Sequence, residues 1–500
     1  MSLKIYNSIS GTKETFHPIL EGRVGMYVCG PTVYNDVHIG NCRTFVSFDV
    51  IYRYLLFLGY KVRYVRNITD VGHLEGDVDS GAEDKISKKA RLEQLEPMEI
   101  VQKYTNGFHE IMRKFNTLDP SIEPRATGHI LEQIEMVEEI IRRGYAYETN
   151  GSVYFDTNKL LRETDVYGKL SGRKVEDLLV ETRDLKNQDE KRHPSDFAIW
   201  IKADERHLLR WNAPWSNGFP GWHLECSVMS TKYLGERFDI HGGGNDLKFP
   251  HHENEIAQSY GACGNTPANY WVHSNMLLLN GKKMSKSEGN NITPTQLFTG
   301  DSPHISKAYS PMVLRFFFLQ AHYSSTLDLN DASLSAAEKG YRRLMDTYTK
   351  LTGIRSNAAV SNHPLAKEME EGIQAAFDEM NDDFNAPKAL ARLFELCTTI
   401  NKLAEGQLSP DDAGQHAIDA VAKGFGDLLF VIFGLQDEAT IAGDQHMAQL
   451  EGLMQLIIDM RQQARQNKDW PTSDKIRDTL AAVHIELKDG KEGTQWKIEN

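Results

Sequence analysis

The 500-residue sequence contains only five cysteines, namely Cys29, Cys42, Cys226, Cys263 and Cys397. An odd number of widely spaced cysteines is a poor disulfide framework for a long chain, so reduced thiols or metal ligands are expected. The sequence also lacks an apolar run of the roughly 18–20 residues that cross a bilayer. Its first residues show no basic-then-apolar signal pattern. These absences predict a cytoplasmic protein that does not bind membranes.

An excess of basic residues is missing as well, because the formal net charge is −14. This excludes a protein coated in basic surface, although nucleic-acid binding depends on where the charge lies and a local basic groove is still compatible. Hydrophobic residues make up 40% and charged residues 25% of the chain, as in ordinary globular proteins. The length predicts about two to four domains.

The first part of the chain alternates strand and helix patterns. Residues 24–29 predict a buried strand, residues 40–58 a helix with apolar residues at helical spacing, and residues 61–69 a second strand. A strand, helix and strand of this size predict a parallel βαβ unit with a right-handed crossover. We therefore expect an α/β, Rossmann-like parallel-sheet domain.

Further patterns follow along the chain. Asn150-Gly151 predicts a hairpin turn within residues 145–157. The polar stretch 158–196 that follows predicts an inserted module. The α/β pattern then resumes with a helix over 222–234, a strand over 237–241, a glycine loop at 242–246, a helix from Pro250 and a strand over 270–279. Beyond Pro311 the patterns are helical, over 311–320, 332–352, 364–381, 386–404, 410–434 and 445–466, before a last helix and a short β-like tail.

These patterns predict a catalytic α/β half, a mostly α-helical C-terminal half and a small mixed α/β tail. The expected parts are the first half of the catalytic domain (1–129), an inserted connective module (130–215), the second half of the catalytic domain (216–300), a linker and stem-contact region (301–330), a helical bundle (331–440) and a C-terminal domain (441–500).

Two short motifs carry phosphate chemistry. His38-Ile39-Gly40-Asn41 lies where the first strand passes into the first helix, and a helix N-terminus attracts phosphate. The cationic stretch KKMSKS, residues 282–287, follows a predicted strand, and its Lys283 and Lys286 can stabilise charge on a departing polyphosphate. Each motif alone is more often an ordinary helix start or a solvated charged loop. Together in one α/β domain they indicate a nucleotide site.

The two motifs resemble the HIGH and KMSKS signatures of class I aminoacyl-tRNA synthetases. The surrounding segments "YVCGPTVYNDVHIGN", "PGWHLECSVMS", "DIHGGGNDLKFPHHENEIAQS" and "GKKMSKSEGN" are similar to those of the cysteinyl-tRNA synthetase family, in the same order. The final "DWPTSDKIRD…DGKEGTQW" resembles the end of that family's anticodon-binding region. The resemblance thus extends nearly from end to end, with weaker detail between about 330 and 450.

The resemblance also implies a metal site. By spacing alone, the cysteines are more often buried structural thiols, because no CxxC pair is present. The positions that match the family's zinc ligands are Cys29, Cys226, His251 and Glu255. His251 and Glu255 are four residues apart on a predicted helix and so share one face. Neighbouring His223, His252 and Glu253 stay as alternative ligands or as supporting residues.

Other site residues are implied by the resemblance. His38, Asn41, Lys283 and Lys286 would be catalytic, and ATP would be bound by His38, Gly40, Asn41, His241, Gly243 and Lys286. Thr69, Trp222 and Asp246 would bind the amino acid, with Asp246 pairing with its ammonium group. Trp470, Arg477 and Trp496 would contact tRNA, since basic and aromatic side chains suit splayed bases. Ser324 stands where the family usually has Arg, which puts one contact to the tRNA backbone in doubt.

The expected activity is that of a cysteine–tRNA ligase with one Zn²⁺ per chain and Mg²⁺ accompanying ATP, acting as a monomer on ATP, L-cysteine and tRNA(Cys). Zinc would bind the substrate thiolate and so select cysteine over serine. Three alternatives remain: a ligase joining cysteine to an amino-sugar, a zinc-dependent hydrolase, and a non-catalytic tRNA-binding protein. The residues after 330 disfavour the first, the KMSKS stretch the second, and the intact phosphate motifs the third.

Overall fold

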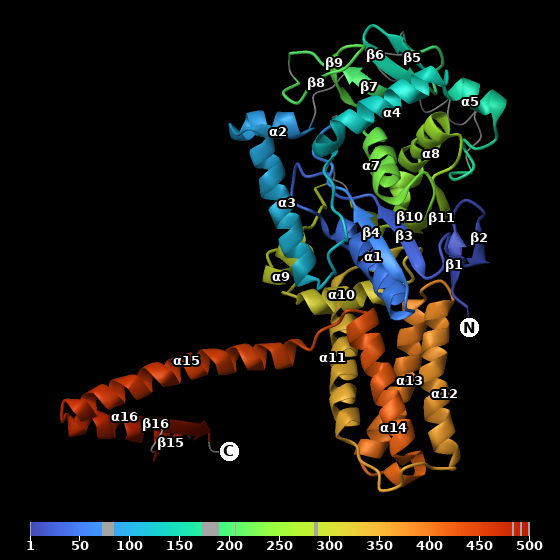
Figure 1. Ribbon diagram of the computed structural model, residues 1–500. Helices are drawn as coiled ribbons and strands as arrows, with labels where there is room; N and C mark the ends of the chain where they lie inside the picture. Colours follow the sequence, from blue (N-terminus) through green and yellow to red (C-terminus); the bar gives the residue numbers. More distant parts are fainter. Residues whose placement is uncertain are drawn as a thin grey trace. The chain divides into compact units, whose positions relative to one another are not determined.

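The computed structural model describes residues 2–72, 85–172, 190–205, 207–284, 289–482, 485–490 and 493–498. The predicted Lys286 lies outside these described residues. The chain divides into two compact units, Met1–Leu435 and Gln436–Asn500 (Figure 1). None of the helices in the described part of the chain combines the length and the apolar character needed to cross a membrane.

A four-stranded parallel sheet forms the centre of the first unit (Figure 1). Its strands, in spatial order, are β11 (Ala268–Ser274), β10 (Phe238–Gly244), β3 (Arg23–Val28) and β4 (Lys61–Arg66). All neighbouring pairs run parallel. Helix α1 (Ile39–Phe57) joins β3 to β4. The predicted βαβ unit and the Rossmann-like fold class are therefore confirmed.

Strand β3 contributes side chains to two different cores. Met26 and Val28 lie in the core that contains α1, whereas Tyr27 and Cys29 lie in a second core. Successive side chains of a strand point to opposite faces of the sheet, which accounts for this division. Cys226 of helix α7 (Leu224–Leu234) belongs to the second core. The fold thus turns Cys29 toward α7.

The glycine loop expected at 242–246 is wrong in its first part, because Gly242, Gly243 and Gly244 are the last residues of β10 and pair with β11. A Cβ atom at Gly242 would lie 2.2 Å from the ring of Phe48 on α1. Glycine in a strand marks such a close approach. It allows α1 to pack directly on the sheet.

The N-terminal residues and the charged region after β4 surround this sheet. Strands β1 (Lys4–Asn7) and β2 (Thr12–Thr15) form a hairpin, and Ser8 N donates a 2.8 Å hydrogen bond to Trp271 O of β11. The stretch predicted to be helical contains α2 (Lys85–Glu93), α3 (Pro97–Lys114), the 3₁₀ turn η1 (Ala126–His129) and α4 (Ile130–Arg142).

A second, antiparallel sheet is inserted between β4 and α7. Its strands, in spatial order, are β5 (Ala146–Thr149), β6 (Ser152–Phe155), β7 (Phe197–Lys202), β9 (Asn217–Pro220) and β8 (Trp211–Asn212). Asn150 and Gly151 have positive φ angles of 53° and 87° and form the predicted hairpin turn. Helix α5 (Thr157–Glu163) follows this hairpin.

After β10 come the turn η3 (Asn245–Lys248) and helix α8 (His251–Cys263). The single strand expected over 270–279 is wrong, because the chain leaves the sheet after β11 and forms a separate strand, β12 (Leu277–Leu279). The carbonyl of Asn275 accepts a hydrogen bond from Arg43, and the carbonyl of Met276 accepts hydrogen bonds from Arg43 and from Leu327 N. Strand β12 pairs with β13 (Lys282–Lys283) and β14 (Leu327–Leu329).

The rest of the first unit is helical, as predicted. Its helices are α9 (Pro294–Thr299), α10 (Pro311–Leu319), α11 (Asp331–Gly353), α12 (Pro364–Asn381), α13 (Ala386–Ala404) and α14 (Pro410–Gly426). The continuous helix expected over 410–434 is wrong, since Gly414 breaks it with a φ of 74°. A π-helical segment, η4 (Asp427–Ile432), ends it.

The second unit matches the predicted tail. It contains α15 (Glu438–Gln466), α16 (Trp470–Ala482) and the antiparallel strands β15 (Ile485–Gly490) and β16 (Gly493–Ile498). Met454, Leu480 and Ile485 form its small core.

Candidate metal centre and phosphate pocket

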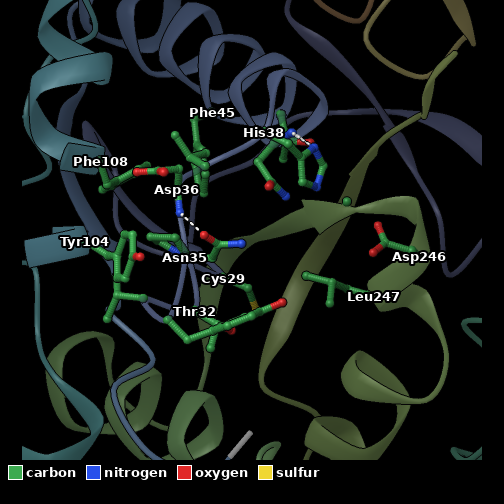
Figure 2. A pocket seen from close by; sticks show the side chains of 18 of the residues that line it. Cys29, Thr32, Asn35, Asp36, His38, Phe45, Tyr104, Phe108, Asp246 and Leu247 are labelled. Atoms are coloured by element: carbon green, nitrogen blue, oxygen red, sulfur yellow. Dashed lines mark hydrogen bonds between the residues drawn. The ribbon is translucent and has the colours of Figure 1, made fainter. Parts of the chain in front are cut away.

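A cavity of about 370 Å³ lies at the carboxyl ends of β3 and β10 (Figure 2). The loop from Cys29 to His38 lines one side of it, and Tyr104 and Phe108 of α3 line another. Parallel α/β sheets bind their ligands at the carboxyl ends of the strands. The cavity therefore occupies the position that the fold favours for a substrate.

The N-terminus of α1 borders this cavity through His38 and Asn41. His38 is the N-cap residue in an extended conformation, and its Nδ1 accepts a 3.3 Å hydrogen bond from Asn41 N. The first turn of α1, which the structure describes completely, contains no acidic side chain. The backbone N–H groups and the helix dipole thus present positive potential to the cavity.

The structure brings the two signature segments together. Met284 and Asn291 line the same cavity as His38. Ile39 N donates a 3.0 Å hydrogen bond to Ile292 O, and a Cβ at Gly40 would lie 3.2 Å from the Met284 methyl group. Glycine at position 40 permits this close contact. Lys283 is exposed on β13.

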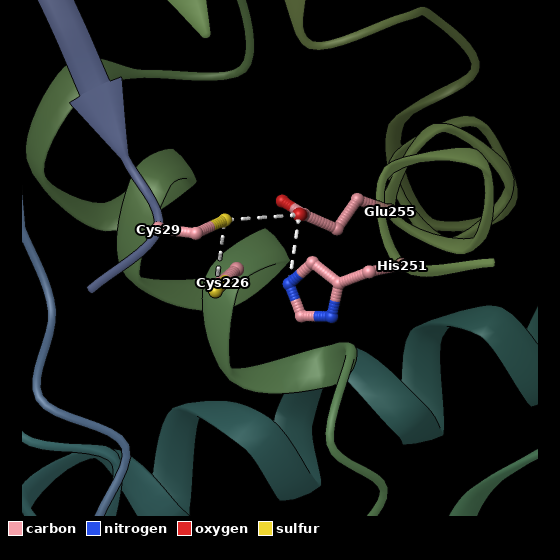
Figure 3. A group of neighbouring side chains, drawn as sticks. All are labelled: Cys29, Cys226, His251 and Glu255. Atoms are coloured by element: carbon pink, nitrogen blue, oxygen red, sulfur yellow. Dashed lines mark hydrogen bonds and ion pairs between the residues drawn. The ribbon is translucent and has the colours of Figure 1, made fainter. Parts of the chain in front are cut away.

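Cys29, Cys226, His251 and Glu255 converge behind the cavity (Figure 3). All four are buried, and one donor atom from each lies within 4.8 Å of the others. The two sulfurs are 3.7 Å apart, and Oε1 of Glu255 lies 3.6 Å from Cys29 Sγ and 3.2 Å from His251 Nε2. These distances allow one metal ion to contact all four groups. Cys29 also lines the cavity, so the cluster reaches the substrate space.

The cluster concentrates negative charge. Burial opposes ionisation of Cys226, but a hydrogen bond from Cys29 and the nearby His251 lower its pKa to about 6. Burial also opposes ionisation of Glu255, but His241 and His251 lower the pKa of this carboxyl to about 2. A buried thiolate beside a buried carboxylate needs a compensating positive charge. Burial opposes protonation of His251, but Cys226 and Glu255 raise its pKa to about 10, so the cluster attracts a cation. The chemistry of these donors therefore suits a metal ion.

Other histidines hold the donor groups in place. His223 Nδ1 lies 2.8 Å from His251 Nδ1, and His241 Nε2 lies 2.8 Å from Glu255 Oε2. A further chain runs from Ser8 through His273 to His252, whose Nε2 lies 3.3 Å from Cys29 Sγ. Such partners orient metal ligands and set their basicity.

A second group of donors, Cys29, His241, His252 and Glu255, also meets the 4.8 Å limit. The first group is favoured for two reasons. Nε2 of His251 is buried and faces Oε1 of Glu255 at 3.2 Å, so it points toward the other donors of the first group. An ion at Oε1 of Glu255 also leaves Oε2 to His241. The first group thus uses a nitrogen that already faces the other donors and leaves both carboxylate oxygens of Glu255 with partners.

Of the three residues predicted to bind the amino acid, two line the cavity and one is buried outside it. Trp222 and Asp246 line the cavity, and the Trp222 ring lies 4.6 Å from that of His251. Thr69 is 2% exposed, does not line the cavity, and donates its hydroxyl proton to Glu225, the residue before Cys226.

Two residues predicted to bind ATP are buried as well. His241 is 0% exposed and its ring stacks on Trp271 with the centroids 4.4 Å apart. A Cβ at Gly243 would lie 3.0 Å from the ring of His252. Both residues therefore pack around the donor cluster, and neither lines the cavity.

Sequence reasoning missed three contributors to the site. Glu225 is 1% exposed and accepts hydrogen bonds from Asn67 and Thr69, and burial raises its pKa well above the usual value. Its position next to Cys226 was the available signal. Tyr104 and Phe108 line the cavity from α3, where they read only as apolar helix residues.

The residues predicted to contact tRNA lie in the second unit. Trp470 is 56% exposed at the start of α16, and Arg477 lies 3.3 Å from Asp474. Trp496 on β16 packs against the small core of this unit. Trp470 is therefore accessible, whereas Trp496 also has a structural contact.

Comparison with known proteins agrees with this arrangement. Residues 15–339 match the family described as tRNA synthetases class I (C) catalytic domain, and residues 377–436 match the DALR domain. The chain is 50% identical to a cysteine–tRNA ligase of Bacteroides thetaiotaomicron and 51% identical to one of Phocaeicola vulgatus, over 99% of both chains in each case.

A methionyl-tRNA synthetase of Mycobacterium tuberculosis, solved with methionyl-adenylate, shares the fold. It has a TM-score of 0.60 at 13% identity, covering 82% of this chain and 92% of that one. The family model matches the catalytic region, and the identity to the two cysteine–tRNA ligases extends over almost the full length. The chain therefore belongs to the cysteine–tRNA ligase family of class I aminoacyl-tRNA synthetases.

Proposed function

We propose that the protein activates L-cysteine with ATP to form cysteinyl-adenylate and pyrophosphate, and then transfers cysteine to the 3′ end of tRNA(Cys). One observation carries the proposal: Cys29 belongs both to the buried donor cluster and to the cavity that His38 and Asn41 line. A site for sulfur and a site for phosphate are thus adjacent. ATP enters as its Mg²⁺ complex.

Cys29, Cys226, His251 and Glu255 would hold a zinc ion. Tetrahedral zinc with metal–sulfur bonds of about 2.3 Å separates two sulfurs by roughly 3.8 Å, and Cys29 and Cys226 have their sulfurs 3.7 Å apart. The donor set of two thiols, an imidazole and a carboxylate also matches the ligands that zinc prefers. When bound, zinc supplies a soft cationic site for the thiolate of the substrate.

Selectivity against serine follows from this chemistry. Rejecting a competitor by about 10⁴-fold requires about 5.5 kcal/mol, more than a pocket normally gains from one isosteric group. A hydroxyl is a much weaker ligand than a thiolate. Trp222, which packs on the ring of His251, would close the pocket around the short side chain, and Asp246 would pair with the ammonium group.

The chain's own residues would then direct the phosphate chemistry. A carboxylate oxygen of cysteine attacks the α-phosphorus of ATP, and the bond from that phosphorus to the departing pyrophosphate breaks. His38, Asn41 and the N–H groups at the start of α1 stabilise the charge on the α-phosphate. Lys283, together with Lys286, would stabilise the charge that develops on pyrophosphate.

Transfer to tRNA completes the reaction. A ribose hydroxyl at the 3′ end attacks the carbonyl carbon of the adenylate, and AMP leaves. Trp470, Arg477 and Trp496 of the second unit would contact the tRNA. The identity to cysteine–tRNA ligases over 99% of the chain, including this unit, supports tRNA over an amino-sugar as the acceptor. We also propose that the protein acts as a monomer in the cytoplasm.

The test is ATP–pyrophosphate exchange driven by cysteine or by serine, with and without a zinc chelator, followed by charging of tRNA(Cys). We expect exchange with cysteine only, loss of exchange on chelation, and recovery on adding zinc. Equal exchange with serine would contradict the role of the metal, and absence of exchange with either amino acid would contradict the proposed reaction.

A further inference from the structure

Arg43 is a buried cation whose hydrogen bonds all go to the main chain. It is 1% exposed and lies on α1, two residues after Asn41. Its Nη1 donates to the carbonyls of Asn275 and Met276 at 3.0 and 2.7 Å, and its Nη2 donates to those of His322 and Ser325 at 3.1 and 2.5 Å. Within the described ranges, no carboxylate forms an ion pair with it.

A buried guanidinium bonded only to carbonyls is unusual, because buried charges normally face an opposite charge. Burial lowers the pKa of Arg43 to about 10, so it still carries its charge at neutral pH. The group therefore draws four carbonyl dipoles together around one positive charge. The positions of these four carbonyls show which chain segments Arg43 holds.

The four carbonyls belong to two chain segments that each lead into a strand. Asn275 and Met276 directly precede β12, and His322 and Ser325 precede β14. These two strands pair in parallel, with Leu277 opposite Leu327. Arg43 thus lies where both strands start and links them to α1.

The sheet formed by β13, β12 and β14 also carries Lys282 and Lys283, the first two residues of the KKMSKS stretch. Strand β12 pairs with β13, and Leu278 lies opposite Lys283. A short path therefore leads from His38 and Asn41 at the start of α1, through Arg43, to β12 and Lys283. Every step of this path is a backbone connection or a direct hydrogen bond.

Thr44, the residue after Arg43 on α1, contacts a different strand. Thr44 Oγ1 lies 2.8 Å from Ser274 Oγ, at the end of β11. This contact stays when Arg43 is changed, and it holds the central sheet against α1. We therefore expect loss of Arg43 to loosen the attachment of the segments after β11 to α1 and to leave Cys29 and the other donor residues in place.

We propose that Arg43 is a positioning residue that sets the β12–β13 hairpin, and with it Lys283, at the correct distance from the phosphate-binding start of α1. The inference rests on the proposed function for its effect on rate, but the placement of the hairpin can be measured without any activity.

The test compares Arg43→Met and Arg43→Lys with the matched variants Arg53→Met and Arg53→Lys. Arg53 is a second buried arginine of α1, 8% exposed, and it bonds Asp49 and the carbonyls of Asn116 and Val431 instead. For each variant, kcat and the KM values for ATP and cysteine are measured by exchange, zinc content by elemental analysis, and backbone mobility by hydrogen–deuterium exchange.

We expect Arg43→Met to lower kcat by about 100-fold, the effect of roughly a 1 Å displacement of a reacting group. Zinc content and the KM for cysteine should stay as in the unmodified protein. Deuterium uptake should rise in β12, β13 and β14 and stay unchanged in β11. Arg43→Lys keeps the positive charge and up to three donors. Its kcat should be about tenfold higher than that of Arg43→Met. The Arg53 variants should show no rise in deuterium uptake in β12, β13 or β14.

Three results would overturn the proposal. The first is a kcat for Arg43→Met equal to that of Arg53→Met. The second is a fall in kcat with unchanged uptake in β12, β13 and β14. The third is a parallel loss of zinc and cysteine binding, which indicates general unfolding around α1. If Arg43→Met does not fold, Arg43→Lys decides by the same criteria. If the unmodified protein shows no exchange at all, the proposed function fails, and deuterium uptake alone tests the placement.

Discussion

Changing Gly242 to alanine tests how closely α1 must pack on the central sheet. The added Cβ would lie 2.2 and 2.3 Å from two ring atoms of Phe48 and 3.1 Å from a third. Carbon atoms in contact are normally about 3.5–4.0 Å apart. The ring, which is 0% exposed, must therefore retreat by roughly 1.5 Å. Because the ring is completely buried, we expect its retreat to displace α1 as well.

The cost follows from this geometry. Overpacking a core costs about 1–3 kcal/mol of unfolding free energy, and the complete burial of Phe48 places this change near the upper value, about 3 kcal/mol. The start of α1 carries His38, and moving it by about 1 Å should lower kcat on the order of 100-fold. Gly242→Ala should thus weaken both stability and cysteine-dependent exchange.

The assay is a double-mutant cycle with denaturant unfolding and ATP–pyrophosphate exchange. Phe48→Leu removes the ring atoms that the new methyl group meets, so Gly242→Ala combined with Phe48→Leu should lose less than the sum of the single changes, by about 1–2 kcal/mol. Gly107→Ala is the matched control, because its Cβ would meet no atom within 4 Å. Full stability of Gly242→Ala, or strict additivity in the cycle, would refute the reasoning.

Three further changes probe the site and its support. Cys29→Ser should lose zinc, measured by elemental analysis, and at least about 100-fold of cysteine-driven exchange, because a hydroxyl is a poor zinc ligand; retained zinc would contradict the assigned ligand. His38→Ala should keep zinc, lower exchange by about 10²–10³-fold and, through the lost cap, cost about 1 kcal/mol of stability; an unchanged kcat would contradict its role. Burial raises the pKa of Glu123, but His109 and Arg66 outweigh it and hold this pKa below its usual value. The stability that Glu123 adds is therefore present above about pH 4.3 and lost as the pH falls through its folded pKa. Glu123→Gln should be less stable than the unmodified protein at pH 7, and this difference should shrink as the pH falls below about 4.3, by thermal unfolding; a constant difference would contradict this.

Local patterns predicted most of the secondary structure because they depend on neighbouring residues. The period of apolar residues placed α1 within a residue or two of Ile39–Phe57, and Asn150-Gly151 predicted the hairpin turn. The errors lie where distant contacts decide. Gly242 reads as a loop residue in the sequence, and only the ring of Phe48 against it explains why a strand contains glycine there.

The prediction of one strand over 270–279 also failed because contacts with distant residues decide the structure there. Most of its residues suit one continuous strand, but the chain leaves the sheet after Ser274, where Arg43 bonds the carbonyls of Asn275 and Met276. Nothing in the neighbourhood of Arg43 in the sequence indicates this contact. The partner segments become close only when the α/β domain is folded.

The sequence by itself determined the family resemblance of this protein, through its signature segments, and the side chains that we predict to bind a metal and phosphate. Side-chain chemistry and short spacing are local properties, so they can be read along the chain. Only the tertiary structure decided which of those groups meet. The parallel sheet turns Cys29 toward Cys226 and α8, brings Met284 over Gly40, and buries His241 behind the donor cluster instead of in the cavity. Those placements depend on contacts between residues far apart in the chain, because strand order and packing fix them rather than local spacing.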